Sequence, residues 1–263
     1  MLKGKVGVVF GLVNQHSLAW HITKALAEAG ASLAITYQSE RFESKVKKLI
    51  AGHLQQTSSP LLLPCNVQDD GEIENVYRKN MGTVKRKSEF NKLDFIVHSI
   101  AYAPREDLEN DFIVTSRSGF QTAMEVSVYS LIAVARLAVP LMKDGGSIVT
   151  LTYLGGQRVV PNYNIMGVAK AALESSVRYL AYDLGKKGIR VNALSPGPVN
   201  TLSSRGIKGF TGFLADVRDH APLRKNTEGS EVGDAALFLC SDLSRGITGD
   251  TIFVDAGYHI KGY

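Results

Sequence analysis

Cysteine is scarce in this 263-residue chain, in which Cys65 and Cys240 are the two present. They form neither a Cys-x-x-Cys pair nor a zinc-type spacing, which excludes a disulfide framework. We therefore expect no metal site and interpret both thiols as small core residues in a reducing compartment. One-sided charge is also missing, because 30 Lys and Arg against 25 Asp and Glu leave a net charge of +5. So small an excess does not indicate a nucleic-acid-binding protein.

Long apolar runs, leader features and linkers are equally hard to find. We find no apolar stretch of the roughly 18 residues that a membrane-spanning helix needs. Residues 1–5 lead into a strand-like run without the apolar core and cleavage site of a signal peptide. Neither a Pro/Ser-rich linker nor an internal repeat divides the chain. We expect a cytoplasmic protein without a membrane span, folded as one domain over residues 1–263.

Short β-branched runs alternate with longer helical segments along the chain. Several of the runs are apolar throughout, as in parallel strands buried on both faces, and the segments between them are long enough for crossover helices. The pattern predicts an α/β, Rossmann-like, doubly wound fold with a seven-stranded parallel sheet. The candidate strands are 5–10, 32–37, 61–65, 93–98, 147–152, 189–194 and 251–254.

The first strand-to-helix turn lacks a GxGxxG motif and has Gly11 as its only glycine, while Ser17 and Leu18 open the following helix. The backbone N–H groups of such a turn suit a pyrophosphate, although an ordinary strand-to-helix turn explains the same residues. After the second strand, Gln38 stands where an NADP enzyme would usually place Arg or Lys for the 2′-phosphate, which favours NADH. The nearby Arg41 leaves NADPH open.

Polar or small residues follow two more of the predicted strands. Asn66 and Val67 follow the third strand, where they would contact the adenine. Ser99, Ile100 and Ala101 follow the fourth, where small side chains let the backbone approach the nicotinamide half. Each set alone fits a strand end with a polar cap. Because open α/β sheets bind ligands at the carboxyl ends of their strands, the two sets together predict a dinucleotide site.

Tyr163 and Lys170 are seven residues apart in a predicted helix. At about 100° per residue this spacing falls about 20° short of two turns, so both side chains project from one face. A reductase needs a donor beside the oxygen that gathers negative charge as hydride arrives, and a cation that holds the cofactor and lowers the pKa of the donor. Tyrosine and lysine supply these groups. A core-edge tyrosine and a surface lysine at a chance spacing are the alternative.

Six segments of the chain closely resemble the enoyl-acyl-carrier-protein reductases of bacterial and plastid fatty-acid synthesis, members of the short-chain dehydrogenase/reductase superfamily. The resemblance extends over nearly the whole chain. Its most specific mark is Tyr-x6-Lys with a second tyrosine, Tyr153, ten residues before Tyr163, whereas ordinary carbonyl reductases of the superfamily use Tyr-x3-Lys. The segments are 11–19, 98–104, 153–156, 163–170, 190–193 and 246–249.

The resemblance implies reduction of the trans-2 double bond of enoyl thioesters with NADH, the last step of the fatty-acid elongation cycle. The implied catalytic residues are Tyr153, Tyr163 and Lys170. Tyr163 would donate a hydrogen bond to the thioester carbonyl and stabilise the enolate, Lys170 would hold the nicotinamide ribose, and Tyr153 would line the substrate site. Ala103 would touch the acyl chain. The implied cofactor contacts are Gly11, Ser17, Leu18, Gln38, Asn66, Val67, Ser99, Ile100, Ala101, Lys170, Val199 and Thr201.

A half-apolar segment interrupted by glycines lies at about 201–217. We interpret it as a mobile flap that closes over the substrate. The resemblance implies an enoyl thioester on acyl carrier protein as the partner, which basic residues of the flap would contact. The family's basic residues after Lys-x-Phe are missing here, because Thr211 and Gly212 follow Phe210. The remaining candidates are Arg205, Lys208 and Arg218.

The resemblance also implies a homotetramer. Small and apolar helix positions would permit close packing between subunits; they are Ala171, Ala172, Ser175, Ser176 and Val177. A further departure is Asn66, where the family commonly has Asp. An amide oxygen still accepts a hydrogen bond from the adenine amino group, so we expect a modest loss of cofactor affinity at most.

Two other functions stay open as alternatives. A short-chain carbonyl reductase would need a serine ahead of Tyr-x3-Lys, but Tyr153 stands where that serine is expected. The Tyr-x3-Lys match at Tyr182 and Lys186 lies at a predicted helix end, which we interpret as solvated. A non-catalytic NAD(H)-binding protein on the same fold would not require Tyr163 and Lys170, and both are present.

Overall fold

The computed structural model describes residues 1–54, 60–77, 92–201 and 209–262. Within these residues, seven strands form one sheet in the order β3-β2-β1-β4-β5-β6-β7, and all neighbouring strands are parallel. The predicted Rossmann-like α/β fold is confirmed. The strands are β1 (Val6–Phe10), β2 (Ser32–Tyr37), β3 (Leu61–Pro64), β4 (Phe95–His98), β5 (Gly146–Leu151), β6 (Ile189–Pro196) and β7 (Thr251–Val254).

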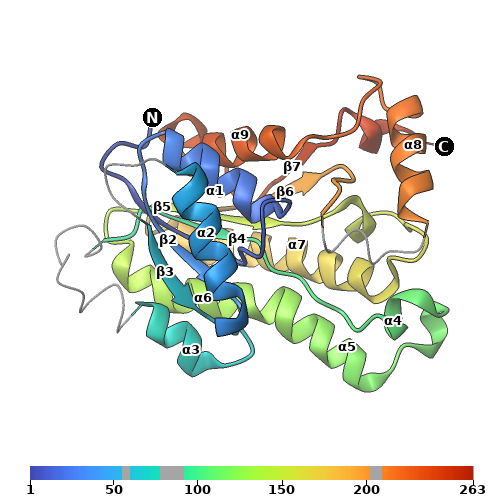
Figure 1. The fold of residues 1–263 in the computed structure, drawn as a ribbon, viewed down its shortest axis with the longest axis horizontal. Coiled ribbons are helices and arrows are strands. Elements are labelled where there is room, and N and C mark those ends of the chain that lie inside the picture. Colours follow the sequence, from blue (N-terminus) through green and yellow to red (C-terminus); the bar gives the residue numbers. More distant parts are fainter. Residues whose placement is uncertain (55–59, 78–91, 202–208, 263) are drawn as a thin grey trace.

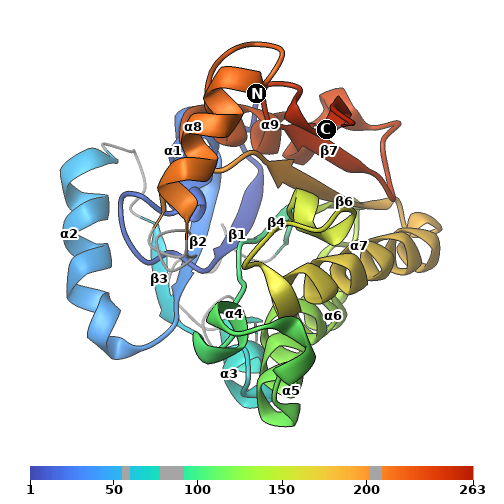
Figure 2. The same cartoon turned by 90° about the vertical axis from the view of Figure 1, so that its right-hand side faces the viewer.

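Helices cover both faces of the sheet (Figure 1). α1, α2 and α9 pack on one face, and α3, α6 and α7 pack on the other, each group around its own buried cluster. Figure 2 looks toward the carboxyl ends of the strands, where α4 and α8 lie on opposite sides. The helices are α1 (Leu18–Glu28), α2 (Glu43–His53), α3 (Asp70–Asn75), α4 (Glu106–Glu109), α5 (Arg117–Met124), α6 (Ser130–Ala138), α7 (Asn164–Gly185), α8 (Phe210–His220) and α9 (Gly229–Cys240).

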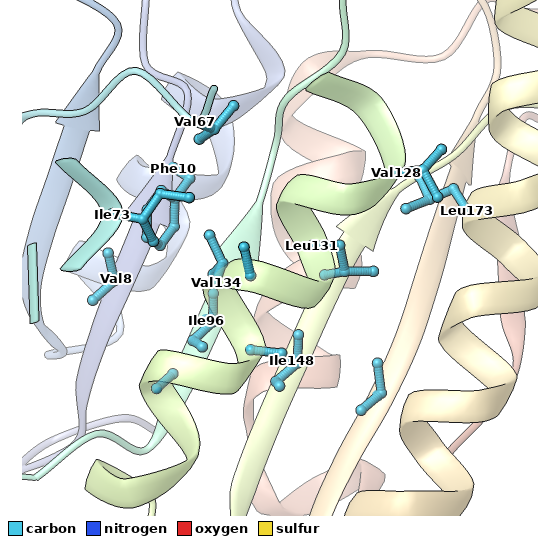
Figure 3. Packing of buried hydrophobic residues seen from close by; sticks show 14 of the residues in the cluster. Val8, Phe10, Val67, Ile73, Ile96, Val128, Leu131, Val134, Ile148 and Leu173 are labelled. Atoms are coloured by element: carbon cyan, nitrogen blue, oxygen red, sulfur yellow. The ribbon is translucent and has the colours of Figure 1, made fainter. Parts of the chain in front are cut away.

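The larger buried cluster fixes α6 on the sheet. Leu131 and Val134 of α6 lie over Ile96 of β4 and Ile148 of β5, as Figure 3 shows, and all four side chains are fully buried. Full burial of an aliphatic side chain of this size contributes about 1.5–3 kcal/mol. This packing fixes α6 against β4 and β5, the strands whose ends carry part of the predicted site.

A π-helical turn, Glu125–Tyr129, joins α5 to α6. Ser127 in this turn is fully buried, and its Oγ accepts a hydrogen bond from the Tyr102 N–H at 3.1 Å. The turn therefore fastens the loop after β4 to the helix layer. Single π-helical turns inside helices are frequent at functional sites.

The helical stretch through this turn, Arg117–Leu141, is long and apolar enough in length and composition to cross a membrane. The stretch contains Glu125 and Arg136, so its apolar residues do not run uninterrupted for 18 positions. Half of its most apolar 18-residue window is buried inside the fold, because α6 packs on the sheet. The core helices of large globular proteins are apolar on most sides and have the same composition as a membrane span.

The outer surface of α7 differs in part from the sequence prediction. Ala171 is exposed, but Val177 is 1% exposed and belongs to the core cluster. The prediction that Val177 lies on a subunit contact is wrong, because its spacing from Leu173 places both on the face that packs on the sheet. Tyr182 and Lys186 are exposed where α7 ends, which confirms the solvated helix end.

Candidate active site

The strand order reverses between β1 and β4, and the loops that leave these strands meet at Gly11 and Ser99. A Cβ atom on Gly11 would lie 2.2 Å from the Ser99 carbonyl oxygen, and the φ of Gly11 is +92°. Only glycine meets both conditions without strain. Open α/β sheets bind their ligands at such a reversal of strand order, so the structure places Gly11 and Ser99 where a dinucleotide site is expected.

The start of α1 borders the same turn. Ser17 is the N-cap residue and Leu18 the first residue of the helix. The Ser17 Oγ donates to the Asn14 carbonyl oxygen at 2.6 Å instead of capping the first turn of α1. The first-turn N–H groups of the helix therefore face the loop with their partial positive charge. This polarity suits a pyrophosphate.

The predicted adenosine contacts lie at the ends of β2 and β3. Gln38 is exposed just beyond β2, as a ribose contact requires. Asn66 Oδ1, the oxygen that would face the adenine, accepts a hydrogen bond from the Gln68 N–H at 3.3 Å. This oxygen is therefore already bonded within a local turn. Val67 is 7% exposed and packs in the core cluster. The backbone at Val67 is therefore better placed for a ligand than its side chain.

The residues predicted for the nicotinamide side follow β4. The Ser99 N–H donates to the Phe10 carbonyl oxygen at 3.2 Å and extends the contact between the two strands. Ser99 and Ile100 are partly exposed and Ala101 is exposed. Ala103 is 8% exposed and belongs to the core cluster. Its side chain therefore packs inward, apart from the surface that the other three residues form.

Tyr153 and Tyr163, which the family resemblance assigns to one site, are in contact. Their ring centroids are 4.8 Å apart with an interplanar angle of 68°, an edge-to-face contact. Gly155 makes the contact possible, because a Cβ there would lie 2.4 Å from Tyr163 Cδ1. Burial raises the pKa of both phenols. Both side chains are therefore neutral hydrogen-bond donors at physiological pH.

Tyr163 precedes α7, whereas the sequence places it inside the helix. It is the N-cap residue, and its neighbours Asn162 and Asn164 have positive φ angles of 63° and 39°. Asn164 Nδ2 donates to the Leu108 carbonyl oxygen at 3.1 Å and to that of Asn110 at 2.7 Å. These bonds to the α4 segment stabilise a backbone conformation that asparagine tolerates better than most residues. They also fix the Tyr163 backbone relative to that segment.

Lys170 lies on the second turn of α7 and is 4% exposed. Its Nζ donates to the Leu151 carbonyl oxygen at the end of β5, at 2.7 Å. Burial lowers the pKa of the ammonium group to about 8, and the Glu174 carboxylate opposes that shift. Lys170 therefore stays largely protonated at neutral pH and provides a cation next to the tyrosine pair's loop.

His98 lies in a buried polar network. The sequence analysis identified this residue only as the end of a strand. Its Nδ1 lies 2.9 Å from Thr150 Oγ1 and its Nε2 lies 2.9 Å from Ser130 Oγ. Ser130 Oγ donates to the Val126 carbonyl oxygen at 2.6 Å, so the serine oxygen accepts the hydrogen bond from the His98 Nε2–H. Burial, helped by the charge of Lys170, lowers the pKa of His98 to about 3. The network links β4, β5 and the π-helical turn around a neutral imidazole.

Glu174 is a second buried group that the sequence analysis missed. It is 6% exposed, and its carboxylate accepts hydrogen bonds from Thr152 Oγ1 at 2.7 Å and from Gln157 Nε2 at 3.1 Å. Its position four residues after Lys170 is the available signal, because side chains with this spacing are neighbours on a helix.

The predicted flap at about 201–217 is described at residue 201 and from residue 209 onward, so Arg205 and Lys208 lie outside the described residues. Val199 and Thr201 form a tight turn after β6, in which the Thr201 N–H donates to the Val199 carbonyl oxygen at 2.8 Å. A cavity of about 190 Å³ lies between α8 and the loop after β5, with Leu154, Phe213 and Tyr258 in its lining. Among the described residues, no three His, Cys, Asp or Glu side chains are grouped to hold a metal ion.

Comparisons with known proteins agree on one family. The family model for enoyl-(acyl carrier protein) reductase matches residues 11–259. The enoyl-[acyl-carrier-protein] reductase [NADH] of Bacillus cereus is 51% identical over 262 residues, which cover 100% of this chain and 99% of the relative.

Solved structures are similar over the same length. The crystal structure of the Bacillus cereus enoyl-acyl carrier protein reductase with NADP+ and indole naphthyridinone has a TM-score of 0.94 and 50% identity, covering 100% of this chain and 99% of the other. The Anaplasma phagocytophilum reductase in complex with NAD has a TM-score of 0.92 and 46% identity, covering 100% and 96%. The chain therefore belongs to the enoyl-acyl-carrier-protein reductase family of the short-chain dehydrogenase/reductase superfamily.

Proposed function

We propose that Tyr163, Lys170 and Tyr153 carry out the NADH-dependent reduction of the trans-2 double bond of enoyl thioesters, the last step of the fatty-acid elongation cycle. The observation that carries the proposal is the edge-to-face tyrosine pair on the segment that follows β5, together with the hydrogen bond of the buried Lys170 to Leu151, the last residue of β5. These groups supply a neutral donor and a cation at the carboxyl edge of a parallel sheet, where this fold binds dinucleotides.

The residues around this edge fit NADH. The Gly11–Ser99 contact, the first turn of α1 and Gln38 would hold the pyrophosphate and the adenosine half. Gln38, just beyond β2, offers a ribose hydroxyl a hydrogen-bond partner and no positive charge for a 2′-phosphate, which supports NADH over NADPH. The Arg41 guanidinium lies over the Phe42 ring, 4.6 Å from its centroid.

Tyr163 acts on the thioester carbonyl. Its neutral phenol donates a hydrogen bond to the carbonyl oxygen and stabilises the negative charge of the enolate. Lys170 would hold the nicotinamide ribose, and its positive charge favours the same enolate. Tyr153 restricts the rotation of the Tyr163 ring through their edge-to-face contact. When bound, NADH supplies the hydride that adds to C3, and a proton added at C2 completes the reduction.

The test follows NADH absorbance at 340 nm with a short trans-2-enoyl thioester, with NADPH in parallel. Tyr163→Phe should lower kcat by about a hundredfold, because it removes one donor to the developing oxyanion, while NADH binding stays close to wild type. Lys170→Met should weaken NADH binding at least about tenfold, because it removes the cation of the site.

Matched controls are Tyr182→Phe and Lys186→Met in the exposed Tyr-x3-Lys match at the end of α7. Both should retain wild-type turnover. If instead the control pair abolishes activity and the Tyr163 and Lys170 variants do not, the site is elsewhere. Turnover of ketones without turnover of enoyl thioesters would favour a carbonyl reductase, and NADH binding without any turnover would favour a binding protein.

Acyl carrier protein is the proposed carrier of the thioester. Of the basic residues expected to contact it, the described one is Arg218, which is exposed on α8 and pairs with Asp219 at 2.8 Å. Exposed ion pairs of this kind contribute at most about 1 kcal/mol. Arg218→Ala should therefore raise the KM for the carrier-protein thioester less than about fivefold and leave the KM for the coenzyme A thioester unchanged. A larger effect on both substrates would contradict a docking role.

We further propose that the enzyme is a cytoplasmic homotetramer. Both cysteines are free and buried, which suits a reducing compartment. The exposed Ile132 of α6 and Tyr179 of α7, together with Ala171, would suit a contact between subunits. Sedimentation equilibrium should give the mass of four chains, and a mass of one chain that still turns over would contradict the assembly.

A further inference from the structure

Two side chains of α7 contact the end of β5 from one face of the helix. Lys170 Nζ donates to the Leu151 carbonyl oxygen at 2.7 Å, and one turn further on Glu174 Oε1 accepts from Thr152 Oγ1 at 2.7 Å. Both α7 side chains are almost fully buried, with 4% and 6% exposure. Leu151, the last residue of β5, and Thr152, which follows it, are therefore each bound by a charged residue of α7. The two charged residues are four positions apart and lie on one face of the helix.

The same carboxylate also holds the loop that carries Tyr153. Gln157 Nε2 donates to Glu174 Oε2 at 3.1 Å, so each oxygen of the carboxylate has a partner from a different end of the segment 152–157. Gly156 lies directly against the helix, because a Cβ there would be 3.0 Å from Glu174 Oε1 and 3.0 Å from the Ala171 nitrogen. The loop thus rests on α7 with Glu174 as its central acceptor.

Glu174 is also the anionic group that acts on Lys170. Of the other titratable groups at the site, His98 from β4 is neutral, since burial lowers its pKa to about 3. Tyr153 and Tyr163 are neutral because burial raises the pKa of both phenols. Among the described residues, the charge that opposes the effect of burial on Lys170 is therefore that of Glu174.

These observations, taken with the proposed function on which the inference rests, assign a role to Glu174. We propose that Glu174 is a positioning residue that fastens the Tyr153 loop to the α7 face of Lys170 and supplies the counter-charge that keeps the buried Lys170 ammonium protonated. The role combines geometry and charge, and two conservative substitutions separate them.

Glu174→Gln keeps the size of the side chain and removes its charge. Lys170 then loses its anionic neighbour, so its pKa falls below the value of about 8 that it has in the wild-type protein. The alkaline limb of the pH profile of NADH-dependent kcat/KM should move to lower pH by about one unit. At pH 8, a fall of the Lys170 pKa from about 8 to about 7 lowers its protonated fraction from about one half to about one tenth.

Glu174→Asp keeps the charge and withdraws the carboxylate by one methylene from Thr152 and Gln157. The alkaline limb should stay in place, while kcat falls about tenfold because the Tyr153 loop loses its anchor. Thr152→Val is an independent test of the anchor that leaves the carboxylate intact, and it should lower kcat several-fold, with recovery in Thr152→Ser. If either Glu174 variant fails to fold, the Thr152→Val and Thr152→Ser variants still test whether the hydrogen bond to Glu174 anchors the loop.

Glu28→Gln, on the exposed end of α1, is the matched control and should keep the wild-type profile. An unmoved alkaline limb in Glu174→Gln overturns the counter-charge role. Wild-type kcat in both Glu174→Asp and Thr152→Val overturns the positioning role. Failure of the proposed function gives a different result, since wild type itself would then lack turnover or would not depend on Tyr163 and Lys170.

Discussion

The neutral, fully buried His98 makes the stability of the fold depend on pH in a way that can be calculated. Its ring bridges Thr150 and Ser130, and its pKa in the folded chain is about 3, compared with 6.5 for an exposed histidine. The unfolded chain therefore binds a proton below about pH 6.5 that the folded chain excludes. Stability contributed by His98 is intact above that pH and is lost as the pH falls from about 6.5 to about 3.

The magnitude follows from the two pKa values. Each pH unit between them corresponds to about 1.4 kcal/mol, so protonation of the unfolded chain lowers the free energy of unfolding by about 2 kcal/mol at pH 5 relative to pH 7.5. His98→Gln retains one donor and one acceptor for the two hydroxyl groups and does not titrate. The variant should therefore be less stable than wild type at pH 7.5 but lose about 2 kcal/mol less on acidification.

Urea unfolding followed by tryptophan fluorescence, at pH 7.5 and pH 5, measures the difference directly. Carboxylates and other histidines titrate alike in both proteins, so the comparison isolates His98. His220→Gln, at an exposed position of α8, controls for the loss of an imidazole. Equal losses of stability in wild type and His98→Gln would refute the conclusion that the native imidazole is neutral.

Three further predictions concern packing and reactivity. Gly155→Ala places a methyl group 2.4 Å from Tyr163 Cδ1, so kcat should fall about tenfold or more with little change in far-UV circular dichroism; wild-type kcat would show that the ring contact is dispensable. Gly11→Ala places a side chain at a positive φ and against the Ser99 carbonyl oxygen. Urea unfolding should therefore show a free energy of unfolding lower by about 1–3 kcal/mol, and fluorescence titration should show a weaker affinity for NADH. Unchanged values of both would contradict the close contact between the two loops. Burial raises the pKa of both cysteines to about 12, so a thiol reagent at pH 8 should modify neither in the native protein and both after denaturation, and rapid native labelling would contradict their burial.

The strands could be predicted from the sequence because their apolar runs are buried on both faces, a strong and local signal. The predicted run 93–98 begins two residues before β4, because Leu93 and Asp94 are held by contacts that precede the ladder. The placement of Gly11 and Ser99 at one edge of the sheet also followed from the sequence, since parallel strands end at the same edge. Their direct contact was seen only in the structure.

Other features depend on partners far along the chain, which local patterns do not reveal. The interruption of the helical path at Tyr163 needs Asn164 and its bonds to Leu108 and Asn110, more than 50 residues away. The burial of Glu174 was hidden for the same reason, because its partners Thr152 and Gln157 precede it by 22 and 17 residues. Val67 was assigned to a ligand contact from its place after a strand and Ala103 from the family resemblance, and the structure buries both side chains.

The π-helical turn Glu125–Tyr129 has a consequence for chain length. It takes up one more residue than an α-helical turn, so deletion of a single residue there is absorbed by a return to regular winding, and Leu131 and Val134 of α6 should stay on the sheet. The contact of Ser127 with the Tyr102 backbone belongs to the turn and would be lost. A chain shortened by one residue in this turn should therefore keep the packing of α6 and lose the fastening of the loop after β4, whereas a deletion within α6 itself would rotate the residues after it by about 100°.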